Sequence, residues 1–258
     1  MKKIYTIRDV PQQQAHLWED QRIKDEVEAC EERGIQHYFS RYLPKNEDIL
    51  EAGCGLGAWV IFLQKKGYRI AGIDNNREVI ERLKQWNPSL NVSCGDIEHL
   101  PCADKTLGAY ISLGVVEHFE EGPEKPLREA FRVLTDGGVI FLTVPFNNIF
   151  RKVVAHPLRS IYLLLHRLRG GNIYFAEYRY SEDEVKQMVE KAGFQILDRG
   201  IDDFEPRTRS LALWSEFPLL RGRQPYTLNL AGRVFAGFMN SVSRKILAAG
   251  VLVIASRG

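Results

Sequence analysis

The chain has 258 residues, 45% of them apolar and 26% charged, with a mean hydropathy of -0.25. These values are typical of a globular chain with a sizeable buried core, and they exclude the disordered, fibrous and collagen-like classes. The formal net charge is +2, but basic residues are concentrated in the segments 147–180 and 205–258 and leave the rest of the chain acidic. Such an asymmetry concerns binding partners rather than the fold.

The N-terminal residues and the cysteines show no pattern of an exported protein. The basic start is not followed by an apolar stretch, as a signal peptide requires. The longest apolar run, 246–255, has about half the length of a membrane-spanning helix. The cysteines have the spacing of neither a disulfide framework nor a zinc site, so we expect no metal and a reducing, cytoplasmic location; they are Cys30, Cys54, Cys94 and Cys102.

The first 47 residues precede the first expected strand and form a charged leader, helical through the segment DQRIKDEVEACEER. From residue 48 on, short apolar runs alternate with helical periodicity. This alternation predicts helices at 59–66, 77–86 and 123–134, and strands at 48–52, 68–74, 91–96, 108–115 and 137–145.

The alternation resumes after a basic interval. Segment 181–193 opens with a Ser-x-x-Glu capping box and ends at Gly193, as a helix does, and the runs 194–202 and 245–256 supply two final strands. Strands too apolar to have a wet face, alternating with helices, indicate a parallel sheet covered on both sides. We therefore expect an α/β, Rossmann-like, doubly wound fold with a mostly parallel seven-stranded sheet and helical or lid insertions.

One domain over residues 1–258 accounts for this organisation. Two segments do not fit the alternation and are longer than ordinary connections, which is typical of lids or binding elements. We expect a helical leader (1–47), a core (48–145), a basic lid insertion (146–180), further core (181–202), a second insertion (203–244) and a final strand (245–258).

A glycine-rich turn follows the first core strand, where an open parallel sheet binds its ligand. The chain there reads EAGCGLGA, with Glu51 before the three glycines Gly53, Gly55 and Gly57. Glycines permit a tight turn and a close approach of backbone to ligand. Asp74, at the end of the second strand, is placed to accept hydrogen bonds from ribose hydroxyls. The pattern also satisfies the dinucleotide fingerprint, so on glycines alone a nicotinamide cofactor remains open.

Further segments in the same order resemble one family. ILEAGCGLGAW, GYRIAGIDNN, CGDIEHLPCADKTLGAYISLGVVEHF and LREAFRVLTDGGVIFLTVPF are together similar to a class I S-adenosylmethionine-dependent methyltransferase of the small-molecule type. The resemblance covers about residues 35–200 and is strongest over 48–146. It implies S-adenosyl-L-methionine as the cofactor and 48–145 as the part that binds it.

The resemblance also assigns positions around the cofactor. Glu51 matches the acid before the glycines, Asp96 and Ile97 match the acid and apolar residue that frame the adenine, and Leu113 lies beside the methionine part. On physical grounds Glu51 can stabilise an ammonium group, and Asn75 can line the other face of the adenine. Several acids suit a cationic sulfonium, whereas they would repel a pyrophosphate.

His118 is the candidate general base. It follows the fourth strand and so faces the methyl group at the carboxyl end of the sheet. A base is needed only if the acceptor must lose a proton, and a histidine here can equally serve packing or hydrogen bonding.

The acceptor is expected to be a small molecule. The Asn/Asp-Pro-Pro-aromatic motif of nucleobase amino-methylation is absent after strand four, where SLGV stands, and no cluster of metal ligands is visible. The acceptor atom is not defined by these residues.

The insertions combine basic and apolar residues. Such segments suit a lipid-like or anionic acceptor and peripheral contact of 147–180 and 205–244 with an anionic membrane; RNA binding is the less favoured alternative, and packing of a cap with solvated arginines is a third. The basic residues of the first insertion that carry this expectation are Arg151, Lys152, Arg159, Arg167 and Arg169.

Two other functions compete with a methyltransferase. One is a nicotinamide-dependent oxidoreductase that uses the same turn, although its first strand would be expected closer to the N-terminus. The other is a non-catalytic protein that binds the cofactor or a membrane.

Overall fold

A seven-stranded sheet forms the centre of the computed structural model, which describes residues 1–8 and 23–258. Its strand order is β4-β3-β2-β5-β6-β9-β8, in which only β9 runs antiparallel to its neighbours β6 and β8. The strands are β2 (Ile49–Ala52), β3 (Ile70–Asp74), β4 (Val92–Cys94), β5 (Leu107–Leu113), β6 (Leu134–Pro145), β8 (Phe194–Asp202) and β9 (Gly250–Arg257). The expected α/β fold with a mostly parallel sheet is confirmed.

Helices cover both faces of the sheet because successive strand residues point to opposite sides. On one face, Ile49 and Ile111 belong to a core with α2 (Ile23–Cys30), α3 (Ile35–Tyr42), α4 (Ala58–Lys65) and α5 (Arg77–Trp86). On the other, Leu50 and Tyr110 pack with α6 (Glu124–Val133) and α8 (Glu182–Lys191). These two layers fix the edge at which the parallel strands end, called here the carboxyl edge.

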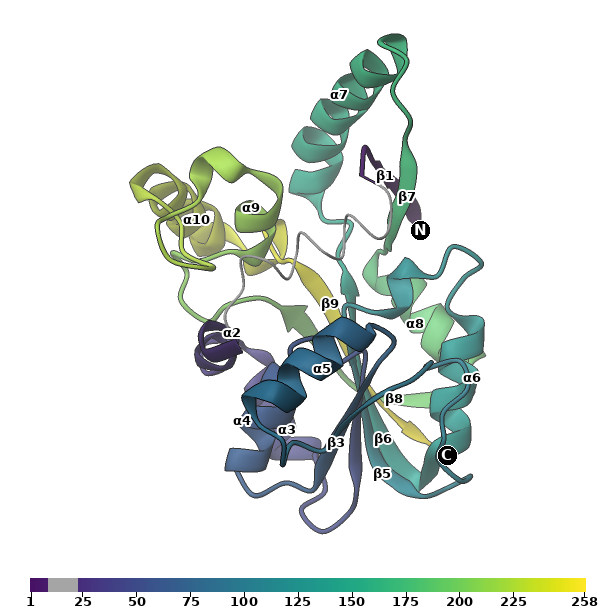
Figure 1. Cartoon of the computed structure of the whole chain (residues 1–258). Coiled ribbons are helices and arrows are strands. Elements are labelled where there is room, and N and C mark those ends of the chain that lie inside the picture. The colour runs from purple at the N-terminus through teal and green to yellow at the C-terminus, as the bar shows by residue number, and fades with distance from the viewer. Residues whose placement is uncertain (9–22) are drawn as a thin grey trace.

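The remaining elements stand beyond the carboxyl edge, at the top of Figure 1. The strands β1 (Lys2–Thr6) and β7 (Tyr174–Arg179) form a separate antiparallel pair. With them lie the π-helical turn η2 (Arg151–Ala155), α7 (His156–Leu168), α9 (Leu211–Glu216), the turn η3 (Pro218–Leu220) and α10 (Leu230–Val242), while the turn η4 (Arg244–Ile246) leads back to β9. We call β1, β7, η2, α7, α9 and α10 the cap; the turn η1 (Val116–His118) follows β5 below it.

The N-terminal leader differs from expectation. Residues 2–6 form a strand rather than part of a helix, because they find a partner in β7 that lies far away in the chain. The expected charged helix is present as α2, whose Ile23 and Cys30 pack on the core, while its first residues, 20–22, lie outside the described part. Within that part, no helix is long and apolar enough to cross a membrane.

Candidate functional site

The glycine turn between β2 and α4 has a backbone that other residues adopt with difficulty. Gly53 has φ +76° and Gly55 has φ +49°, both in the left-handed region. A Cβ at Gly53 would lie 2.5 Å from a methyl carbon of Val115, so the segment after β5 packs directly on this turn. The spacing of the glycines therefore reflects both backbone conformation and close packing.

Hydrogen bonds tie the turn to the end of β3. The N–H groups of Gly53 and Cys54 both donate to the carbonyl of Ile73, at 2.8 and 3.0 Å. The N–H of Gly55 donates to Asp74 Oδ2 at 2.8 Å, and that of Asn76 donates to Asp74 Oδ1 at 2.9 Å. Each carboxylate oxygen keeps a further lone pair, so the backbone fixes Asp74 while leaving acceptors for a ribose diol.

Glu51 is buried at the end of β2, with 4% of its surface exposed. Its Oε2 accepts the N–H of Val60 at 3.1 Å, in the first turn of α4, where a negative charge is favoured by the helix dipole. Burial, together with the nearby Asp74, nevertheless raises the pKa of Glu51 to about 8. The residue thus anchors α4, and its expected contact with an ammonium group stays a prediction.

The other expected cofactor residues gather at the same edge. Register places Asp74 beside Cys94, so Asn75 and Asp96 follow neighbouring strand ends and are exposed there. Asp96 accepts the N–H of Glu98 at 2.9 Å and lies 3.3 Å from the ring of His99.

Two apolar residues complete this set. Ile97 is buried in the core shared with α6, and Leu113 is half-buried at the end of β5. Leu113 and the residues after β4 therefore lie on opposite sides of the glycine turn, as the order β4-β3-β2-β5 requires. The roles of all four residues toward a ligand stay predictions.

His118 ends η1, one turn after Val115 has packed on the glycine turn. Its Nδ1 lies 2.8 Å from the carbonyl oxygen of Ala176 in β7. Because a carbonyl can only accept, Nδ1 carries the hydrogen and the lone pair of the neutral ring is on Nε2. The side chain is exposed, and its Nε2 lies on the side of Glu117.

A buried carboxyl group accompanies His118. Glu117 Oε1 lies 3.9 Å from His118 Nε2, and Oε2 has no hydrogen-bond partner in the described part. Burial raises the pKa of Glu117 to about 7. Desolvation lowers the pKa of His118, but Glu117 and Glu177 outweigh it, so this pKa lies above its ordinary value. Its position next to His118 in the sequence suggests an orienting partner, but adjacency does not reveal the burial of Glu117.

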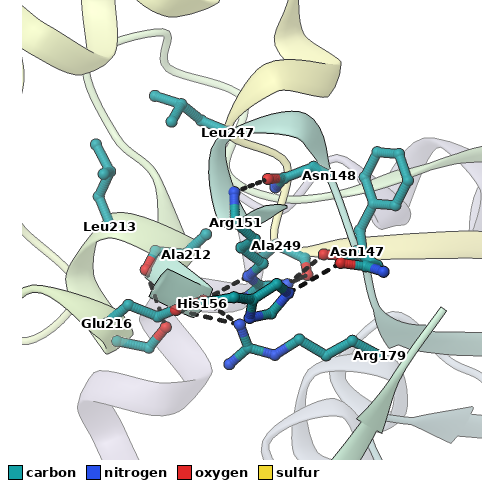
Figure 2. Close-up of polar contacts among 12 residues, drawn as sticks. Asn147, Asn148, Arg151, His156, Arg179, Ala212, Leu213, Glu216, Leu247 and Ala249 are labelled. Carbon is teal, nitrogen blue, oxygen red and sulfur yellow. Dashed lines mark hydrogen bonds and ion pairs between the residues drawn. The ribbon is translucent and has the colours of Figure 1, made fainter. Parts of the chain in front are cut away.

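Sequence reasoning also missed the ion cluster that joins the two insertions (Figure 2). Glu216 in α9 accepts from Arg151 Nε and, at 3.0 and 3.1 Å, from Arg179 Nη1. Arg151 Nη1 also donates to the carbonyls of Phe146 and Ala249, each at 2.8 Å. The expectation that Arg151 contributes to a basic surface is wrong: it is 5% exposed because Glu216 and two carbonyls satisfy it inside the protein. Arg151 and Glu216 are 65 positions apart in the chain, and nothing in the sequence indicated this pairing.

The residues that position the turn coincide with a region of sequence similarity. A model of the methyltransferase domain matches residues 50–142, from β2 to β6. A probable S-adenosylmethionine-dependent methyltransferase of Mycolicibacterium smegmatis is 25% identical over 151 residues, which cover 58% of this chain and 53% of that protein. Residues 50–142 thus match a methyltransferase domain, and the expected resemblance to S-adenosylmethionine-dependent methyltransferases is confirmed over this region. These relatives support S-adenosylmethionine, the cofactor expected from the sequence.

A further relative and a solved structure are also methyltransferases. A malonyl-[acyl-carrier protein] O-methyltransferase of Dechloromonas aromatica is 31% identical over 153 residues, 58% of this chain and 52% of that protein. The chain thus spans about half the length of these curated relatives. A chain in the solved complex between the Haloferax volcanii Trm112 methyltransferase activator and a methyltransferase aligns with a TM-score of 0.63 over 98% of this chain and 99% of its own length, at 19% identity, and supports the fold.

The donor set fits a cationic cofactor. Asp74 and Glu51 both lie at the turn, and a sulfonium or ammonium group would favour the ionised form of Glu51, whereas a pyrophosphate would disfavour it. Gly53 and Gly55 contribute no side chains of their own to this turn, and Val115 packs against Gly53. The nicotinamide alternative is not favoured by the turn or by the relatives.

We predict that Glu51 makes S-adenosylmethionine binding depend on pH. A bound cation favours the charged carboxylate, so binding below the free pKa of about 8 should release a proton, and affinity should rise from pH 6 to 8 and level off above. Glu51→Gln keeps an acceptor for Val60 but cannot ionise. Calorimetric titrations measure the affinity of both proteins across this pH range. The difference between the two pH profiles is the contribution of Glu51, because ionisation of the ligand affects both proteins equally. Identical pH profiles would contradict the prediction.

Proposed function

We propose that the protein transfers a methyl group from S-adenosylmethionine to a small-molecule acceptor. The observation that carries this proposal is the glycine turn held by Asp74 at the carboxyl edge, inside the region that matches the methyltransferase domain. When bound, the cofactor supplies an electrophilic methyl group on a good leaving group. The protein then needs mainly to orient the two reactants in line and to exclude water.

Each predicted residue has a part in this positioning. Asp74 would hold the ribose, and Glu51 would attract the ammonium end. Asp96 would accept from the adenine amino group, with Ile97 and Asn75 against the ring faces. Leu113 would lie beside the methionine part, near the turn on which Val115 packs.

For an acceptor that must lose a proton, His118 is the base we propose. Its Nε2 is the unprotonated nitrogen of the neutral ring, because Nδ1 donates to Ala176. The neighbouring Glu117 would stabilise the imidazolium after proton uptake, as the direction of the His118 pKa indicates. His118 would act on the acceptor, and Glu117 would be its positioning residue.

Asp74→Ala tests the cofactor site. Loss of the carboxylate leaves ribose hydroxyls unpaired and frees the Gly55 N–H, which should weaken S-adenosylhomocysteine binding by about 1 to 3 kcal/mol, on the order of 10- to 100-fold. Asp48→Ala is the matched control, since Asp48 is an exposed acid just before β2, at the opposite end of that strand from the turn. Titration calorimetry measures both, and wild-type affinity in Asp74→Ala would remove the assignment.

His118→Gln separates chemistry from binding. If His118 is the base, kcat should fall on the order of 100-fold while cofactor affinity is retained. In the wild type, kcat should rise with pH through a pKa above the ordinary histidine value, because only the neutral ring accepts a proton. This step should vanish from the variant's profile. An unchanged kcat, measured where methyl transfer is rate-limiting, would make His118 structural.

The acceptor class we propose is lipid-like or anionic. Related proteins bear the names malonyl-[acyl-carrier protein] O-methyltransferase and 2-methyl-6-phytyl-1,4-hydroquinone methyltransferase, the latter for a substrate with an apolar chain. In this chain the cap presents two helices whose outer faces are apolar and exposed. The exposed apolar residues of these faces are Leu158, Ile161, Tyr162, Leu164, Leu165 and Leu168 of α7, and Leu230, Val234, Phe238 and Val242 of α10.

Basic residues accompany these faces. Lys152, Arg167 and Arg169 flank the apolar face of α7, and Arg233 lies in α10. A helix with such a face binds anionic bilayers by charge and shallow insertion. We propose that the cap acts as a lid that also rests on an anionic membrane surface, from which an acceptor is taken.

Cosedimentation with vesicles tests the membrane contact. The protein should pellet with anionic vesicles and not with neutral ones, and added salt should weaken binding because exposed charges are screened over about 10 Å at 0.1 M. Changing both Arg167 and Arg169 to Glu should reduce it, whereas Lys24→Glu in α2, away from the cap, should not. Equal binding to neutral and anionic vesicles, or binding to neither, would contradict the proposed membrane contact. A salt-sensitive gel shift with RNA would favour the nucleic-acid alternative.

A further inference from the structure

The cap holds a cavity that the methyl transfer proposed above does not use. It has a volume of about 350 Å³, within the range of small-molecule sites, and lies between the end of β1, the first half of α7 and the end of α9. Its lining residues are Tyr5, Thr6, Ile7, Ala155, Leu158, Arg159, Tyr162, Leu163, Glu216 and Phe217. Most of the wall is apolar, and two charged groups stand in it.

The two charged groups in the cavity are not equivalent. Glu216 is balanced by Arg151 and Arg179, and Arg179 also donates to Glu177 at 2.8 Å. Arg159 makes no ion pair within residues 1–8 and 23–258, and its one hydrogen bond there, from Nη1 to the carbonyl of Tyr5, is long at 3.2 Å. The buried cluster therefore has one more guanidinium than carboxylates, and the surplus positive charge faces the cavity.

This charge is costly without a counter-ion. Arg159 is partly buried, and burial and the nearby Arg179 lower the pKa of its guanidinium although Glu216 and Glu177 act in the opposite direction. A desolvated cation gains most from an anionic ligand, and a guanidinium offers a planar fork that matches a carboxylate or a phosphate. Histidine does not add to the charge, because burial lowers the pKa of the adjacent His156 to about 4 and keeps the ring neutral.

The apolar wall continues out of the cavity. Leu158 and Tyr162 line it and are also more than half exposed, one turn apart on α7. Beyond them the exposed face of α7 extends to Leu165 and Leu168. A ligand with its anionic group at Arg159 therefore has an apolar surface along which a chain can lie.

We propose that this cavity binds an anionic amphiphile, with its carboxylate or phosphate on Arg159 and its apolar chain against Leu158, Tyr162 and Leu163. The site goes beyond the proposed methyl transfer and does not depend on it. It is nevertheless close to the reaction site, since β1, which lines the cavity, pairs with β7, whose Ala176 accepts from His118.

Dodecyl phosphate, titrated calorimetrically below its micelle concentration, tests the site. We expect one molecule per chain, bound at least 10-fold more tightly than inorganic phosphate or dodecanol, since each lacks one half of the recognition. Arg159→Gln should weaken binding at least 10-fold. Arg199→Gln, which removes an exposed arginine from β8, outside the cap, should change it less than twofold.

Arg159→Gln also removes the hydrogen bond from Arg159 to Tyr5 in β1, so a second variant that keeps this bond is needed. Leu158→Glu places a negative charge in the cavity wall at a position exposed enough to tolerate it, and should also weaken binding at least 10-fold. Wild-type affinity in both Arg159→Gln and Leu158→Glu, or equal binding of dodecanol, would overturn the proposal. S-adenosylhomocysteine titrations of the same proteins report separately on the methyltransferase site, so failure of one assignment is distinguishable from failure of the other.

Discussion

The attachment of the glycine turn to the end of β3 is the constraint on which the site depends. Three consecutive N–H groups, from Gly53 to Gly55, bond to the carbonyl of Ile73 and the carboxylate of Asp74. This attachment sets where α4 begins, and Glu51 then secures its first turn through Val60. It also sets the surface on which Val115 packs, and so the position of η1 with Glu117 and His118. The expected cofactor residues and the proposed base thus share one support.

Charge and apolar packing together hold the cap, since Leu213 of α9 and Ala236 of α10 share a small apolar core. Glu216 brings together two arginines from different parts of the chain, and the carbonyls of Phe146 and Ala249 bind Arg151 to the ends of two central strands. A buried carboxylate between two guanidiniums is a weak source of stability but a strong source of specificity, since either partner alone would be an unbalanced charge. The cap therefore has a fixed position on the sheet, although the outer faces of α7 and α10 are exposed.

The repeating part of the fold was predictable because it follows local rules. Apolar runs such as 108–115 and the capping box at Ser181 indicate strand and helix without knowledge of partners, and the structure has β5 and α8 there. The glycine turn and Asp74 were predictable because backbone geometry limits residue choice. Strand β1 was not, since a five-residue run has no strand character without β7 beside it. Arg151 was misjudged for the same reason: its burial depends on Glu216, and sequence shows the charge but not the counter-charge.

The place of β9 has a consequence for how the chain folds during synthesis. β9 lies between β6 and β8, and β8 pairs with no other strand of the sheet. Without residues 250–257, β6 is an unpaired edge strand whose residues are mostly buried in the folded protein, and β8 has no strand with which to pair. An unpaired apolar edge is a template for wrong pairing with other chains. Without β9 the strand order leaves a five-stranded sheet, β4-β3-β2-β5-β6, with β6 as the edge that would need protection.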